Sequence, residues 1–120
     1  TTEGDAYRFF SFPEPGIALR VNAPSDVHIS LNPVSFEEVP RMEILIGVNN
    51  NTNSIIRRNG AEDVVVAMTP NILRPGFWNG FRVVFSNWVV MVFREGEQFP
   101  FMGYNMQEFY PVTFYGIRTP

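Results

Sequence analysis

The chain has 120 residues, 45% of them hydrophobic and 15% aromatic, which suffices for one domain with a core of its own. It contains no cysteine, so disulfides, thiolate catalysis and zinc–thiolate sites are excluded. The net charge of −3 argues against a nucleic-acid-binding surface, and no apolar run approaches the ~18 residues that a membrane-spanning helix needs.

Apolar and polar residues alternate with a period of two through the N-terminal half, which predicts β-strands. The expected strands cover residues 7–12, 16–21, 26–31, 42–48 and 52–58. Prolines follow the first two of these strands, and an Asn-Pro step ends the third. The run Asn49-Asn50-Asn51 separates the last two, and asparagine tolerates the left-handed geometry of tight turns.

The C-terminal half continues this pattern. Asn59-Gly60 is a strong two-residue hairpin signal, with residues 63–68 as the returning strand. Residues 69–76 are expected to form a loop with room for one short helical turn. Further strands are predicted over 81–85, 88–94, 99–104 and 112–118, with a turn at Ser86-Asn87. Nine or ten short strands without a convincing helix predict one all-β domain, an antiparallel jelly-roll β-sandwich spanning residues 1–120.

The residues offer no convincing catalytic constellation. Asp26, His28 and Ser30 alternate onto one face of a predicted strand, and His28 is the only histidine of the chain. Residues two apart in a strand lie about 7 Å apart and project in parallel, which makes a direct Ser–His hydrogen bond awkward. Carboxylates that could act as a pair exist at Glu37, Glu38, Glu43, Glu95 and Glu97, but most fall in predicted turns, where charge is expected. Metal-ligand spacing and glycine-rich nucleotide loops are missing. We therefore predict no catalytic residue, no metal site and no cofactor.

Polar and aromatic side chains suited to ligand recognition occur in two groups. Residues 49–54 and 57–59 supply amides, hydroxyls and guanidinium groups, which carbohydrate or anionic ligands require, and the tryptophans offer a stacking face. The alternative is that the asparagines only form turns, the arginines lie on a solvated strand and the tryptophans belong to the core. The candidate ligand-binding residues are Asn49, Asn51, Arg57, Arg58, Trp78, Trp88 and Tyr104.

The two adjacent arginines carry a more specific expectation. Arg57 and Arg58 must point to opposite faces of their strand, so one of them points inward. A guanidinium placed there is costly unless it is paired, and Glu43 on the preceding strand is the expected partner. This pairing would make one arginine structural and leave the other for a ligand.

The triplet Asn50-Asn51-Thr52 is an N-glycosylation sequon. It predicts glycosylation at Asn50, and it favours a secreted or extracellular location.

Several stretches of the chain together form a recognisable pattern: residues 42–47, 51–58, 69–73, 80–81, 94–97, 100–102 and 115–119. They resemble the farnesoic acid O-methyltransferase-like domain family of invertebrates, and their order holds from about Val21 to Thr119. One departure from that family is that its turn glycine is replaced here by Trp88. Another is that its Gly-Gly-Trp reads Gly47-Val48-Asn49.

The family name implies methyl transfer from S-adenosylmethionine to a sesquiterpenoid acid. The family also appears within larger extracellular proteins, including complement-like macroglobulins, which implies an interaction module. A second resemblance, at the level of the fold, is to galectins, because residues 25–33 are similar to the galectin stretch that ends in Asn-Pro. The galectin sugar-binding pattern His-x-Asn-x-Arg is absent.

We expect a non-catalytic, extracellular recognition module that binds glycan or protein through its loops or a concave sheet face, and does not bind nucleic acid. Two alternatives stay open. One is a methyltransferase that acts on an isoprenoid acid, and the other is a purely structural module that contacts other domains of a larger chain.

Overall fold

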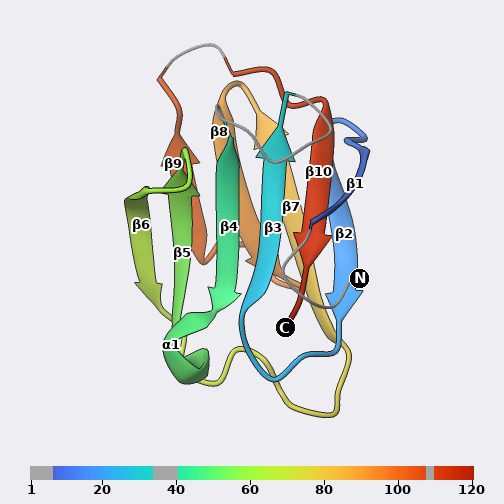
Figure 1. The fold of residues 1–120 in the computed structure, drawn as a ribbon, viewed down its shortest axis with the longest axis vertical. Helices are drawn as coiled ribbons and strands as arrows, with labels where there is room; N and C mark the ends of the chain where they lie inside the picture. The colour runs from blue at the N-terminus through green and yellow to red at the C-terminus, as the bar shows by residue number, and fades with distance from the viewer. Residues whose placement is uncertain (1–6, 34–40, 108–109) are drawn as a thin grey trace.

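The computed structural model describes residues 7–33, 41–107 and 110–120, and they form an antiparallel β-sandwich (Figure 1). The six-stranded sheet has the order β1 (Arg8–Ser11), β10 (Phe114–Arg118), β3 (Val27–Asn32), β4 (Met42–Gly47), β5 (Asn53–Arg58) and β6 (Glu62–Met68). The four-stranded sheet has the order β2 (Gly16–Val21), β7 (Asn79–Ser86), β8 (Val89–Arg94) and β9 (Met102–Asn105). The predicted all-β jelly-roll sandwich is confirmed.

The core lies between the two sheets and follows from the alternation in the sequence. In β7, Phe81 and Val83 are buried while Arg82 between them is exposed, and in β8 Val90 and Val92 are fully buried. The facing sheet contributes a second layer of branched side chains: Val27, Ile29, Leu31, Ile44, Ile46 and Ile56. Burying this apolar set is the main favourable term in folding, and it assigns each strand face to the core or the outside.

Several expected boundaries differ from the structure by one to three residues. The turn between β7 and β8 is Asn87-Trp88, one residue later than predicted, because β7 runs on to Ser86. Both turn residues have positive φ angles, 51° and 62°, as a two-residue hairpin of the primed type requires. The strand expected from residue 99 begins only at Met102, after Pro100, which has no N–H to donate to a ladder. The last strand, expected from residue 112, begins at Phe114.

The run of three asparagines forms a left-handed helical turn, α1 (Val48–Asn51), between β4 and β5. The φ angles of Asn49, Asn50 and Asn51 are 52°, 59° and 62°, which confirms the predicted left-handed geometry. Residues 69–76 contain turns but no helix. In the described ranges α1 is the only helical segment, and none is long and apolar enough to cross a bilayer.

Candidate ligand-binding groove

A groove of about 580 Å³ lies at one end of the four-stranded sheet, where β2, β7 and the end of β8 meet. A smaller extension of this groove, of about 250 Å³, shares Ala18 and Arg82 with it and continues toward Pro15. The residues that line the larger groove are Ala18, Leu19, Arg20, Phe81, Arg82, Glu95 and Gly96.

The strand register explains why this face is hollow. Arg20 lies opposite Gly80, whose carbonyl accepts a hydrogen bond from the amide of Glu95. Arg20 and Glu95 are thus separated by two strand spacings, about 10 Å. Their side chains reach one another across the position where Gly80 has no side chain. A Cβ added to Gly80 would lie 2.4 Å from Oε1 of Glu95, so this bridge requires glycine.

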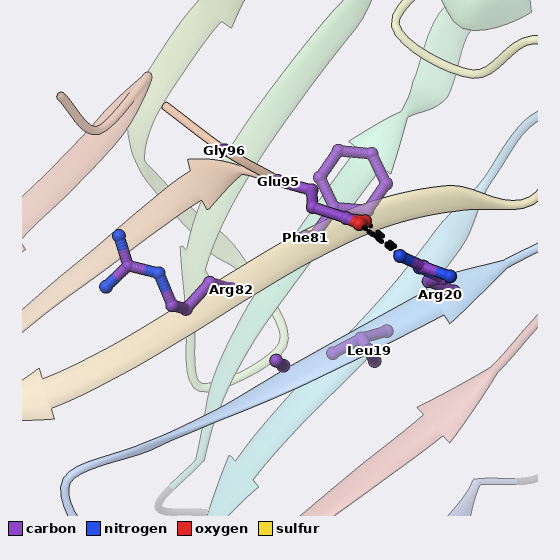
Figure 2. Close-up of a pocket in the computed structure, with 7 residues that line it drawn as sticks. Leu19, Arg20, Phe81, Arg82, Glu95 and Gly96 are labelled. Carbon is purple, nitrogen blue, oxygen red and sulfur yellow. Dashed lines mark hydrogen bonds and ion pairs between the residues drawn. The ribbon is translucent and has the colours of Figure 1, made fainter. Parts of the chain in front are cut away.

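The bridge is bidentate. Nε of Arg20 donates to both carboxylate oxygens of Glu95 at 3.0 and 3.1 Å, and Nη2 donates to Oε2 at 2.7 Å (Figure 2). These hydrogen bonds lower the pKa of Glu95, so its carboxylate is ionised at neutral pH. The pair is exposed to solvent and therefore contributes little to stability. Its planar edges are available to a ligand.

Arg82 lies in the next row of the sheet, between Ala18 on β2 and Phe93 on β8. Figure 2 shows its side chain extending away from the Arg20–Glu95 pair. The guanidinium carbon lies 4.0 Å from the centroid of the buried Phe93 ring, so the aromatic face orients the cation. Among the described residues no carboxylate pairs with Arg82. Arg82 therefore presents a guanidinium group, held in one orientation, to a ligand in the groove.

This arrangement suits one kind of ligand. The small residues Ala18 and Gly80 leave room on the sheet, and the two rows of charged side chains are about 7 Å apart along the strands. An oriented guanidinium recognises a carboxylate, sulfate or phosphate through paired hydrogen bonds. The groove can bind an anionic group at Arg82 and hydroxyl groups at the Arg20–Glu95 pair.

The predicted ligand residues of the asparagine turn have different surroundings. Asn49 and Asn50 are exposed in α1, so the Asn50 sequon is on the surface, and its glycosylation stays a prediction. Asn51 is buried, and its amide bonds both backbone groups of Leu73: Nδ2 donates to the Leu73 carbonyl at 2.6 Å and Oδ1 accepts from its N–H at 3.1 Å. We therefore assign Asn51 a structural role.

Arg57 and Arg58 each pair with an acid of the neighbouring strand β6. Nε of Arg57 contacts Asp63 at 2.7 Å, and Nη2 of Arg58 contacts Glu62 at 2.9 Å. Both arginine side chains remain about one-third exposed, at 30% and 32%. The expectation that one of them is buried against Glu43 is wrong. It failed because β6 offers acids at the register positions beside both arginines.

Glu43 is instead buried on the outer face of the six-stranded sheet by residues from other parts of the chain. The hydroxyl of Tyr7 donates to its Oε2 at 2.7 Å, and Nε of Arg41 lies 3.5 Å from its Oε1. Burial and the carboxylate of Glu43 together raise the pKa of Tyr7 well above its ordinary value.

The predicted aromatic residues do not form one site. Trp78 precedes β7 and Trp88 follows it, so the strand places them at its opposite ends, which the rise per residue of a strand puts about 30 Å apart. Both are largely exposed, at 67% and 47%. Tyr104 is partly buried and packs against the core. Binding by these three residues stays a prediction, but Trp78 and Trp88 do not share one stacking face.

The strand face that carries His28 and Ser30 shows no nucleophile–base pair. The Ser30 hydroxyl donates to the Asn32 side-chain oxygen. Nδ1 of His28 lies 2.9 Å from Nη2 of Arg118, and because a guanidinium can only donate, Nδ1 is the acceptor. In the described part of the chain, no three acids and histidines come together as a metal site would require.

His28 predicts a loss of stability in mild acid. Burial and the nearby Arg118 lower its pKa from the ordinary 6.5, Arg57 acts in the same direction, and Glu43 and Asp26 oppose them. The folded state thus favours the neutral ring, so its contribution is present above about pH 6.5 and is lost as pH falls. Urea unfolding at pH 7 and pH 5 should show a smaller pH effect in His28→Gln, whose amide oxygen can still accept from Arg118. An equal effect in both proteins would contradict this.

The groove residues were missed as a site by sequence reasoning. Arg20 and Arg82 were visible only as exposed positions of alternating strands, and Glu95 as a turn residue. A faint signal existed in Gly80, a glycine at the start of a strand, which can mark a close approach of other groups.

Comparison with protein families matches residues 4–120 to the family described as farnesoic acid O-methyl transferase. No curated protein and no solved structure matches the chain. The match covers nearly the whole sequence, including every strand that forms the groove. The chain therefore belongs to the farnesoic acid O-methyl transferase family.

Proposed function

We propose that this domain is a non-catalytic recognition module that binds an acidic saccharide in the groove of the four-stranded sheet. The observation that carries the proposal is Arg82, a guanidinium oriented on Phe93 and paired with no carboxylate among the described residues. A uronate carboxylate would accept paired hydrogen bonds from Arg82. The sugar hydroxyls would meet the Arg20–Glu95 pair.

The proposal predicts a selective loss of binding in Arg82→Gln. Removing a charge-assisted, bidentate contact costs about 1.5–3 kcal/mol, which corresponds to a roughly 10- to 100-fold weaker affinity. Arg82→Lys should lose a large part of the affinity too, because an ammonium cannot form the planar fork. We would titrate oligogalacturonate and a heparin-derived tetrasaccharide by calorimetry, and we expect the melting temperature to change little because Arg82 is exposed.

Arg74→Gln is the matched control. Arg74 is also exposed and also lies over a phenylalanine, Phe77, at 4.4 Å, but it does not line the groove. Its replacement should leave acidic saccharide binding unchanged. Equal binding by the Arg82 and Arg74 variants, or no binding of acidic saccharides by the wild-type protein, would refute the proposal.

The family description favours a second candidate function, methyl ester formation on an isoprenoid acid. The groove supports it to the extent that Leu19 and Phe81 lie near Arg82, since a hydrocarbon tail and a carboxylate need those two environments. The groove does not fit S-adenosylmethionine, because the sulfonium cation would lie near two arginines. The one lining carboxylate, Glu95, is already held by Arg20. We derive no catalytic step from it.

The same calorimetric titrations distinguish the two candidate functions. Saturable binding of farnesoic acid that depends on Arg82, together with binding of S-adenosylmethionine and methyl farnesoate detected by mass spectrometry, would establish the second function. Binding of acidic saccharides without saturable heat from S-adenosylmethionine would establish the first.

A further inference from the structure

A second hollow lies at the end of the sandwich that carries the β7–β8 turn, and it differs chemically from the groove. Its volume is about 490 Å³. The residues that line it are Glu14, Pro15, Phe85, Ser86, Asn87, Trp88, Tyr110, Pro111, Val112 and Thr113. Among these described residues there is no arginine, and the one charged group is the carboxylate of Glu14. The groove, by contrast, is lined by two guanidinium groups.

Trp88 is the least expected residue of this hollow. It is the second residue of a two-residue hairpin turn and has a φ angle of 62°. That position favours glycine, because a side chain there crowds the following carbonyl. Trp88 nevertheless adopts this conformation, and 47% of its surface is exposed. Strained residues of this kind persist only where the surrounding structure holds them, and they cluster at active sites and ligand-binding sites.

The hollow also has an aromatic wall and polar groups that a ligand could contact. Phe85 and Tyr110 form a fixed aromatic wall, with ring centroids 6.4 Å apart, and the Tyr110 hydroxyl donates to the Leu31 carbonyl at 2.6 Å. Ser86, Asn87 and Glu14 have no side-chain hydrogen bond to another described residue. The fold leaves a hydroxyl, an amide and a carboxylate beside an exposed indole.

We propose that this hollow is a binding site for an uncharged saccharide, whose ring stacks on Trp88. The apolar face of a pyranose suits an indole ring, and its hydroxyls can donate to the Glu14 carboxylate and exchange hydrogen bonds with Asn87 and Ser86. An acidic sugar would be repelled by Glu14. The proposal does not depend on the groove, which would bind saccharides of the opposite class.

The decisive variant is Trp88→Gly, because asparagine followed by glycine is the preferred sequence for this turn. Since the substitution relieves the left-handed strain, the melting temperature should rise by about 2–5 °C. Removing the stacking ring should weaken saccharide binding by about tenfold or more. A substitution that stabilises the fold while abolishing binding is the signature of a residue kept for its ligand.

The titration uses the full chain and a Trp78→Phe background, in which Trp88 is the only tryptophan. We would add cellotriose, maltotriose, lactose and diacetylchitobiose up to about 10 mM, a range that covers the weak affinities usual for single stacking contacts, and follow the Trp88 emission. Calorimetry with the same saccharides measures binding by Trp88→Gly, which has no Trp88 emission to follow. At least one saccharide should give a saturable shift that Glu14→Gln weakens. Oligogalacturonate binding by Trp88→Gly should be unchanged, because the groove lies elsewhere.

Three outcomes would overturn the proposal. A lower melting temperature of Trp88→Gly would show that the indole holds the turn by packing. The absence of any saturable shift with the four saccharides would reject the ligand class. A shift produced by tetramethylammonium but by no saccharide would identify a cation site instead.

Discussion

Replacing Asn51 with alanine is expected to lower the free energy of unfolding by about 3 kcal/mol. The Asn51 amide satisfies the N–H and the carbonyl of Leu73, whose residue surface is fully buried. The backbone of Asn51 also accepts a hydrogen bond from Asn71 at 2.8 Å. Without the amide, two buried backbone groups lose their partners, and only backbone hydrogen bonds still hold the loop that leads to Trp78 and β7 to this turn.

The matched control is Asn49→Ala, because Asn49 shares the left-handed conformation but is exposed. Its side chain makes no hydrogen bond to another described residue. Placing alanine at a positive φ there should cost about 1 kcal/mol. The difference between the two variants in urea unfolding measures the contribution of the Asn51 amide. Equal losses would mean that these two hydrogen bonds contribute nothing.

Replacing Glu43 with alanine is expected to cost about 2–4 kcal/mol of stability. The Glu43 side chain is 5% exposed, and it accepts the Tyr7 hydroxyl and faces Arg41. Truncation leaves a buried phenol and a largely buried guanidinium without their carboxylate, and an unpaired buried group costs more than an exposed one. Thermal unfolding at neutral pH measures this loss.

Two further variants show whether the loss belongs to this contact. Asp63→Ala breaks the Arg57 pair, whose members are 30% and 38% exposed, and should cost less than about 1 kcal/mol. Tyr7→Phe combined with Glu43→Ala closes a double-mutant cycle that isolates the Tyr7–Glu43 coupling. Additive single losses, or an Asp63→Ala loss as large as that of Glu43→Ala, would contradict the assignment.

The two proposed ligand sites differ in the charge of the side chains that line them. The groove of the four-stranded sheet presents Arg82 and Arg20, whereas the hollow at the β7–β8 turn presents Glu14 and Trp88. β7 connects them, since residues near its start line the groove and residues at its end line the hollow. A glycan with acidic and neutral residues could therefore contact both sites on one domain.

The strands and most of the turns could be predicted from the sequence, because they depend on residues that are neighbours in the chain. Alternation separates the core face of a strand from its outer face within a few residues, as with Phe81 and Arg82. The left-handed asparagine turn was predictable for the same reason, since the tolerance of asparagine for positive φ is a property of the residue. The Asn87-Trp88 turn was displaced by one residue because tryptophan carries no local signal for that conformation.

Which side chains contact one another could not be predicted, because it depends on how the strands are arranged in space. The groove joins Arg20 of β2 to Glu95, 75 residues later, across Gly80 of β7, and Tyr7 reaches Glu43 over 36 residues. Alternation places Glu43 and Arg57 on the same side of the sheet, yet strand order puts acids of β6 beside the arginines and Tyr7 beside Glu43. Strand order and register arise from packing two whole sheets against one another, and that information is distributed over the entire chain.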